Sequence, residues 1–151
     1  MKAVIQRVIS ASVKADGNLS GHIENGLLIF LGIGVTDTAK EAQLLALKTS
    51  KLRVFSDSDG KMNLSVLDIG AGVLVVSQFT LMANCRKGNR PSFSLSAQPS
   101  LASDLYKIYI EELKNSGVQN VEQGVFGADM KVELINDGPV TIIYDTKEWE
   151  K

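Results

Sequence analysis

The chain has 151 residues, 44% of them hydrophobic and 22% charged, and a formal net charge of −1 at pH 7. These values are typical of a globular protein, and we expect a single domain over residues 1–151. No apolar run approaches the roughly 20 residues of a membrane helix. The near-neutral charge argues against a protein that coats nucleic acid, but it allows a small basic patch that grips one end of an RNA. The single cysteine, Cys85, excludes an internal disulfide and favours a reducing cytoplasm.

The first stretch, residues 2–14, reads as a long strand. Its alternation places one set of side chains on a common side: Ala3, Ile5, Arg7, Ile9, Ala11 and Val13. Arg7 is unusual in this set, because a guanidinium is seldom buried without a partner. An edge strand that lets Arg7 reach water is an equally good interpretation.

The next segments predict a hairpin, a strand and a helix in turn. Asp16-Gly17 is a strong hairpin turn signal, and residues 27–35 form a second apolar strand. The capping-box spacing of Thr38 and Glu41 predicts a helix that runs to about Leu52. Its inward stripe is expected to contain Ala42, Leu45, Thr49 and Leu52.

The apolar run 72–76 has the pattern of a strand that is buried on both faces. It continues into Ser77-Gln78-Phe79-Thr80-Leu81 with no Gly or Pro to end it. Polar groups at the rim of a rigid core are a common place for a functional site. The alternative is that Ser77, Gln78 and Thr80 are ordinary residues of a strand end.

The second half of the chain adds a basic loop, a helix and three strands. Residues 82–99 are the least regular stretch, and their cations Arg86, Lys87 and Arg90 belong either to a solvated loop or to a binding surface. A helix is expected over 100–115, with Leu101, Leu105, Ile108 and Glu112 or Leu113 at helical spacing. Strands are expected over 121–126, 131–135 and 140–144. One α+β domain with two main helices follows from this layout.

Side chains with familiar catalytic chemistry are scarce. His22 is the only histidine and Cys85 the only cysteine, so neither a thiolate zinc site nor a Cys-x-x-Cys redox pair is possible. Asn136-Asp137-Gly138-Pro139-Val140-Thr141 is the remaining signal, and its plain interpretation is a hairpin turn between two strands. Pro139 complicates this interpretation, because it removes a ladder donor and allows a cis bond.

Together, Ser77-Gln78-Phe79-Thr80 and Asn136-Asp137-Gly138-Pro139-Val140-Thr141 resemble the signature of the D-aminoacyl-tRNA deacylases. The resemblance runs nearly from end to end. Further matches are Gln6-Arg7-Val8, Lys87-Gly88-Asn89-Arg90-Pro91-Ser92-Phe93 and Phe126-Gly127-Ala128-Asp129-Met130. Either main motif alone is a weak signal, whereas both motifs in this order are highly specific.

The resemblance implies a homodimeric enzyme with a barrel-like β-sheet core, which hydrolyses the ester between a D-amino acid and the 3′-terminal adenosine of tRNA. It implies a pocket lined by Ser77, Gln78, Phe79 and Thr80 of one subunit. Gly138 and Pro139 of the other subunit would enter this pocket as a cis dipeptide, which Arg7 helps to hold. We expect Arg86, Lys87, Arg90 and Met130 to contact tRNA. Neither a metal nor an organic cofactor is implied, and tRNA mischarged with glycine is a further expected substrate.

The absence of an obvious general base favours chemistry carried by the main chain and the substrate. N–H groups near Phe79 and Thr80 could stabilise the developing negative charge, and the resemblance suggests that the ribose 2′-hydroxyl of the tRNA handles the proton. Three alternatives remain: a Thr80 nucleophile, a module that binds RNA ends without turnover, and a thiol- or Thr-dependent esterase of small acyl esters.

Overall fold

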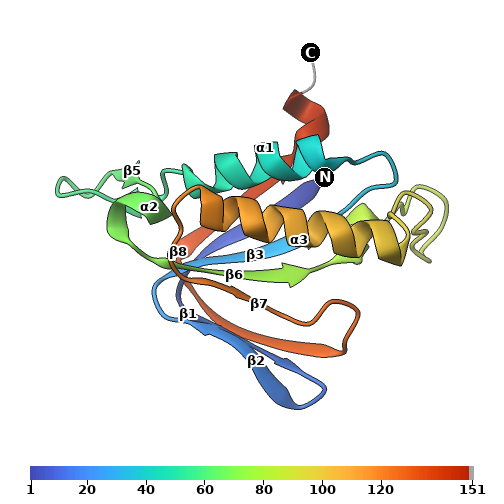
Figure 1. Ribbon diagram of the computed structural model, residues 1–151, viewed down its shortest axis with the longest axis horizontal. Coiled ribbons are helices and arrows are strands. Elements are labelled where there is room, and N and C mark those ends of the chain that lie inside the picture. The colour runs from blue at the N-terminus through green and yellow to red at the C-terminus, as the bar shows by residue number, and fades with distance from the viewer. Residues whose placement is uncertain (150–151) are drawn as a thin grey trace.

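The protein forms a curved six-stranded sheet that carries two helices on one face (Figure 1). The computed structural model describes residues 1–149. The strands of the sheet are β1 (Lys2–Ala15), β2 (Asn18–Ile23), β3 (Gly26–Gly32), β6 (Gly72–Ser77), β7 (Val121–Gln123) and β8 (Met130–Asp145). The two long helices are α1 (Ala39–Ser50) and α3 (Pro99–Asn115). The predicted α+β class, with a barrel-like sheet and two main helices, is confirmed.

The fold also contains several shorter strands and helices outside the six-stranded sheet. β4 (Phe55–Ser56) and β5 (Met62–Leu64) form a small separate sheet, and α2 (Val66–Ile69) leads back toward β6. Two 3-10 helices follow strands: η1 (Phe79–Met82) after β6, and η2 (Thr146–Trp149) after β8. Among the described residues, no helix is long and apolar enough to cross a membrane.

β1 is the central strand. Along one side it pairs with β3 over its first half and with β2 over its second half, and along the other side it pairs with β8. β3, β6 and β7 run parallel, with α1 and α3 in the connections between them. The hydroxyl of Ser20 on β2 donates to the carbonyl of Gln123 on β7 at 2.9 Å, which draws the ends of the sheet together. The interpretation of β1 as an edge strand is therefore wrong.

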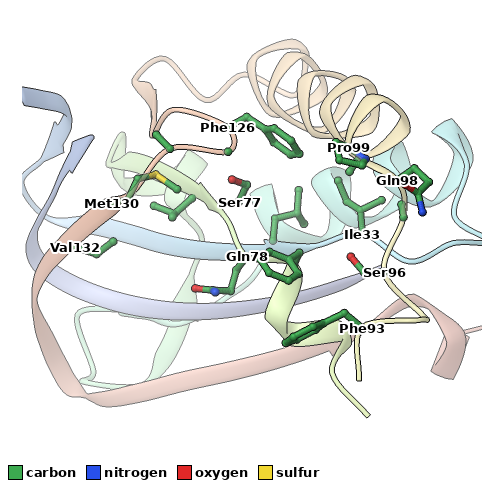
Figure 2. A pocket seen from close by; sticks show the side chains of 17 residues that line it. Ile33, Ser77, Gln78, Phe93, Ser96, Gln98, Pro99, Phe126, Met130 and Val132 are labelled. Atoms are coloured by element: carbon green, nitrogen blue, oxygen red, sulfur yellow. The ribbon is translucent and has the colours of Figure 1, made fainter. Parts of the chain in front are cut away.

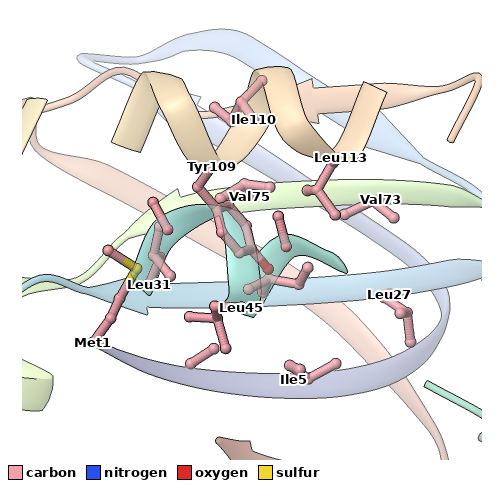
Figure 3. Packing of buried hydrophobic residues seen from close by; sticks show 14 of the residues in the cluster. Met1, Ile5, Leu27, Leu31, Leu45, Val73, Val75, Tyr109, Ile110 and Leu113 are labelled. Atoms are coloured by element: carbon pink, nitrogen blue, oxygen red, sulfur yellow. The ribbon is translucent and has the colours of Figure 1, made fainter. Parts of the chain in front are cut away.

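The two faces of the sheet carry separate cores. On the helix-covered face, Tyr109 of α3 points between α1 and the strands, and its hydroxyl donates to Thr49 at 3.0 Å (Figure 3). The opposite face buries a smaller cluster that includes Val8, Ala11 and Val13. The predicted alternation of β1 is therefore wrong at Ile9, which is 53% exposed. The pairing of β1 with β8 shifts register between Val8 and Ser10, and this bulge moves the second half of β1 to the other face.

The helices begin largely as predicted, but the buried stripe of α3 matches the expected positions only in part. The capping box of Thr38 and Glu41 is present, and the hydrogen bond from the Thr38 hydroxyl lowers the pKa of Glu41. Of the predicted positions in α3, Leu105 and Leu113 are buried and Ile108 packs against the core, whereas Leu101 is 39% exposed. The buried residues are Ala102, Leu105, Tyr106, Tyr109, Ile110 and Leu113. Two tyrosines thus take inward positions, because their hydroxyls find acceptors inside the protein.

A buried ion pair joins the start of β1 to the segment after β3. The amino group of Met1 donates to Asp37 Oδ1 and to the hydroxyl of Thr146, both at 2.7 Å. The other carboxylate oxygen of Asp37 accepts from the N–H of Gly34 at 2.6 Å. The Met1 amino group therefore joins three segments that are far apart in the sequence: the start of β1, the Asp37 segment and Thr146.

We predict that Asp37→Ala lowers the free energy of unfolding by about 3–5 kcal/mol, because it leaves a buried amino group without its charged partner. Denaturant unfolding of this variant and of a control measures the effect. The control is Asp59→Ala, since Asp59 is exposed in the turn between β4 and β5. Equal midpoints for Asp37→Ala and Asp59→Ala would contradict the structural role of Asp37.

Candidate functional site

A cavity of about 590 Å³ opens where β6 ends, beside the start of α3 and the segment between β7 and β8 (Figure 2). Predicted residues Ser77, Gln78, Phe79 and Met130 all line it. The remaining lining residues are Leu31, Ile33, Val76, Phe93, Ser96, Ala97, Gln98, Pro99, Ala102, Phe126, Gly127, Ala128 and Val132. None of these side chains titrates near neutral pH. The cavity is thus a mainly apolar pocket with a polar rim, which is the usual form of a small-molecule site.

The polar rim is made by a sharp change from strand to 3-10 helix. β6 ends at Ser77, although no Gly or Pro marks this end in the sequence. The N–H of Gln78 still donates to the carbonyl of Leu31 at 2.8 Å, and the first 3-10 bond runs from the N–H of Leu81 to the carbonyl of Gln78 at 3.2 Å. The N–H groups of Phe79 and Thr80 precede that bond and lack an acceptor in the turn. Neither donates to any other residue between 1 and 149.

The polar side chains of the rim are partly occupied with one another. Gln78 Nε2 donates to the hydroxyl of Thr80 at 2.6 Å. Thr80 itself is exposed and does not line the cavity. Because its hydroxyl contacts an amide and no base, the geometry gives Thr80 no activation as a nucleophile.

Aromatic residues pack together in two walls of the cavity and hold them in place. Tyr106 of α3 donates from its hydroxyl to the carbonyl of Val75 at 2.9 Å, and its ring lies 5.8 Å from that of Phe126, centroid to centroid. Burial raises the pKa of Tyr106, which keeps the phenol neutral and able to donate. On the other side, the rings of Phe79 and Phe93 meet edge to face at 4.9 Å. The strand end that carries Ser77 is therefore anchored from two directions.

The segment Asn136–Thr141 forms a bulge of several extra residues within β8. Both halves of β8 pair antiparallel with β1, so the predicted hairpin turn is wrong: the chain continues in the same direction. Gln6 pairs with Thr141 and Val8 pairs with Asn136, so the residues between Asn136 and Thr141 exceed those available on β1. The side-chain amide of Asn136 closes the bulge by bonding to both the N–H (2.8 Å) and the carbonyl (3.0 Å) of Val140.

Arg7 lies opposite this bulge and holds its base. Its side chain is only 12% exposed. Nε donates to the carbonyl of Asp137 at 2.9 Å, and Nη1 donates to the carbonyl of Val54 at 2.6 Å. The carboxylate of Asp137 lies 3.5 Å from Nε. These contacts account for a guanidinium in an apolar strand, because its charge and donors are satisfied by the bulge and by the segment before β4.

At the tip of the bulge, Gly138 and Pro139 are joined by a cis peptide bond, and both residues are exposed. Gly138 has a φ of +145°, a conformation that L side chains rarely adopt. A Cβ at this position would lie 2.9 Å from the main-chain nitrogen of Val140. The tip therefore requires glycine.

The predicted residues thus form three groups. Ser77, Gln78, Phe79 and Met130 meet in the cavity; Arg7, Gly138 and Pro139 meet at the bulge, and none of these three lines the cavity of its own chain. The third group consists of Arg86, Lys87 and Arg90, which are exposed on a loop closed by paired Asn84 and Ser92. None of these cations forms an ion pair with a residue between 1 and 149.

The cavity also contains residues that are not among the predicted site residues. Phe93 and Phe126 form walls, and in the sequence both stand out only as parts of longer motifs. Gln98 and Ala102 come from the start of α3, where neither pattern nor composition signals a site. No cluster of His, Cys, Asp or Glu in the described part of the chain could hold a metal ion.

Comparisons with known proteins point to one family. The family model described as D-Tyr-tRNA(Tyr) deacylase matches residues 4–145. A protein of Fusobacterium nucleatum named D-aminoacyl-tRNA deacylase is 55% identical over 148 residues, which cover 98% of this chain and 97% of that protein. One from Dictyoglomus turgidum with the same name is 54% identical, covering 100% and 96%. A solved structure titled c-Myc DNA Unwinding Element Binding Protein superposes with a TM-score of 0.90 at 41% identity, covering 96% of this chain and 98% of that one.

Proposed function

The chain belongs to the D-Tyr-tRNA(Tyr) deacylase family, and from this membership we propose that it hydrolyses the ester bond of D-aminoacyl-tRNA, releasing the D-amino acid and free tRNA. The observation that supports this most strongly is the end of β6, where main-chain donors without acceptors stand at the rim of an apolar cavity. A cavity of about 590 Å³ is of the size that holds a small ligand, here the terminal aminoacyl-adenosine. A cytoplasmic location fits this substrate.

We infer a mechanism in which the protein stabilises charge and supplies no base. Water attacks the ester carbonyl, and the oxyanion that forms accepts hydrogen bonds from the N–H groups of Phe79 and Thr80. Such a donor is commonly worth about 2.7–4 kcal/mol. The bond to the ribose 3′-oxygen then breaks, and the proton lost by the water ends on that oxygen. Because no titratable side chain lines the cavity, we assign the proton relay to the ribose 2′-hydroxyl.

The second part of the proposal is that the site is shared between two copies of the chain. Gly138 and Pro139 are exposed and lie outside their own cavity, so a role at the site requires them to enter the cavity of a partner. Large apolar side chains flank the bulge on the exposed surface of β8: Ile135 is 56% and Ile143 is 70% exposed. Such residues are suited to a dimer interface.

A rigid main-chain tip also explains how an enzyme could accept many D-residues and refuse L-residues. If the Gly138 and Pro139 carbonyls face the substrate α-carbon, a D-substrate places its hydrogen and amine there, whereas an L-substrate drives its β-carbon into them. Differences in side-chain contact give only about 10–200-fold discrimination. Glycine has no β-carbon, so we propose that glycyl-tRNA is also cleaved.

The function is tested by incubating the protein with D-Tyr-tRNA and L-Tyr-tRNA and following release of tyrosine. Release from the D-substrate alone supports the proposal. Release from neither favours a module that binds RNA ends. Turnover of small acyl esters together with inactivation by alkylation of Cys85 favours an esterase, although Cys85 lies in the exposed loop and not in the cavity.

For the oxyanion site, we predict that Thr80→Ala hydrolyses D-Tyr-tRNA at nearly the wild-type rate, whereas the rate of Thr80→Pro is about 100–1,000-fold lower. The alanine keeps the main-chain donor and proline deletes it. Single-turnover rates measure both, and circular dichroism checks that Thr80→Pro is folded. A folded Thr80→Ala enzyme without activity would instead favour the hydroxyl as nucleophile.

For the basic loop, we predict that neutralising Arg86, Lys87 or Arg90 raises the KM for D-Tyr-tRNA. A plot of the logarithm of the tRNA association constant against the logarithm of the salt concentration has a negative slope. This slope should become shallower by about 0.7–0.9 for each phosphate that the loop no longer neutralises. Lys61→Ala is the matched control, because Lys61 is an exposed cation beside β5, at the opposite end of the molecule from this loop (Figure 1). If all three loop variants keep the salt dependence of wild type, the loop is a solvated loop that does not contact tRNA.

For chiral selection, we predict that Gly138→Ala slows D-Tyr-tRNA hydrolysis or admits L-Tyr-tRNA while the protein stays folded. The added Cβ meets the Val140 nitrogen, and the φ of +145° becomes unfavourable. Gly60→Ala controls for the conformational cost, since Gly60 also has a positive φ (+75°) but nothing within 4 Å of its Cβ position. A Gly138→Ala enzyme with the rate and selectivity of wild type would contradict the role of the tip.

A further inference from the structure

Two phenylalanine rings at the cavity contact each other but are not part of the hydrophobic core. Phe79 is 57% exposed, and neither Phe79 nor Phe93 belongs to a core cluster. The rings meet edge to face, with centroids 4.9 Å apart and planes at 66°. Figure 2 shows Phe93 at the margin of the cavity, on the side away from Phe126. This geometry fixes Phe79 in place while most of its surface stays accessible.

Positively charged residues lie close to this aromatic pair along the chain. Arg90 precedes Phe93 by three residues, so the chain between them spans at most about 10 Å. The loop that carries Arg86, Lys87 and Arg90 is closed by reciprocal main-chain bonds between Asn84 and Ser92, at 2.8 and 2.9 Å. Ser92 is the immediate neighbour of Phe93, so the closed end of the loop lies beside the Phe93 residue.

An exposed aromatic face close to cations that form no ion pair within residues 1–149 is a combination suited to binding single-stranded nucleic acid. Unpaired bases stack on aromatic side chains, while Lys and Arg contact the phosphates. The proposed terminal aminoacyl-adenosine is of a size to occupy the cavity. The nucleotide before it must then lie outside, at the cavity margin, where the rings and the loop are found.

We propose that Phe79 and Phe93 form a stacking site for the unpaired base that directly precedes the terminal adenosine of tRNA. The phosphates of that nucleotide face the loop of Arg86, Lys87 and Arg90. The inference rests on the proposed function for its ligand and adds a second contact to it. It also assigns the Phe79 side chain a role distinct from that of its main-chain N–H.

The test measures binding of uncharged tRNA, so that it does not depend on hydrolysis. Two tRNAs are compared: one with a normal base before the terminal adenosine, and one that is abasic at that nucleotide. With wild-type protein, we expect the abasic tRNA to bind about 5- to 150-fold more weakly, the range found for the loss of one stacked base. With Phe79→Leu and with Phe93→Leu, the normal tRNA should bind more weakly, and the difference between the two tRNAs should largely disappear.

Leu19→Ala is the control. Leu19 is 63% exposed on β2 and lies away from the cavity lining, so this variant should keep the full abasic penalty. Equal affinity of wild type for both tRNAs overturns the proposal, as does an undiminished abasic penalty in both phenylalanine variants. If either variant changes the oligomeric state but leaves the abasic penalty intact, the rings cover a protein interface, and the proposal is also overturned. Failure of the proposed function is seen separately, as absence of tyrosine release from D-Tyr-tRNA.

Discussion

The contacts of Arg7 with the bulge in β8 are the constraint on which the proposed site depends. A guanidinium in a central strand must be paired, and it finds the carbonyls of Asp137 and Val54 and the carboxylate of Asp137. The bulge in turn needs such a donor, because the residues between Asn136 and Thr141 have no partners in the register with β1. Together with the side chain of Asn136, Arg7 gives an irregular segment a fixed base, so that its tip can stand out from the sheet as a rigid feature.

The end of β6 is the complementary half of the site. Its strand is held by the core, by the Tyr106 hydroxyl and by the Gln78 N–H, so the change to a 3-10 helix occurs at a fixed place. The turn leaves main-chain donors without acceptors next to an apolar cavity. Hydrogen-bond donors that are fixed in advance can stabilise a developing oxyanion without reorganising during the reaction. A site with no titratable side chain can therefore be suited to ester hydrolysis when the substrate carries its own hydroxyl.

The two halves differ in how far the sequence predicts them. The capping box, the Asp16-Gly17 hairpin and the buried strand before Ser77 are predictable, because each depends on local chemistry. The bulge looks like a hairpin turn in the sequence, because Asn-Asp-Gly favours a turn locally and only the pairing of both flanks with β1 keeps the chain straight. The exposure of Ile9 and the inward stripe of α3 likewise depend on register and tertiary packing, which no single segment encodes.

The site residues also divide into those that the sequence predicts and those that only the fold brings to the site. Ser77, Gln78, Phe79 and Met130 are expected from the sequence and lie together in the cavity. Phe93 belongs to a matching motif, but its place in the cavity wall, like that of the start of α3, depends on the fold and could not be inferred. The position of Arg7 beside Asp137 agrees with the expectation that it holds the Gly138–Pro139 dipeptide. The entry of that dipeptide into the cavity of a second copy stays a prediction.

Subunit complementation tests whether the Gly138–Pro139 tip of one chain enters the cavity of another. Thr80→Pro damages the cavity and leaves the bulge intact, whereas Gly138→Ala damages the bulge and leaves the cavity intact. In a mixed dimer, the intact cavity of one chain receives the intact tip of the other, so random mixing of the two impaired variants should restore up to about a quarter of the wild-type sites. Recovery of D-Tyr-tRNA hydrolysis after co-refolding is the predicted result. A mixture no more active than the two variants assayed separately would contradict a site shared between two chains.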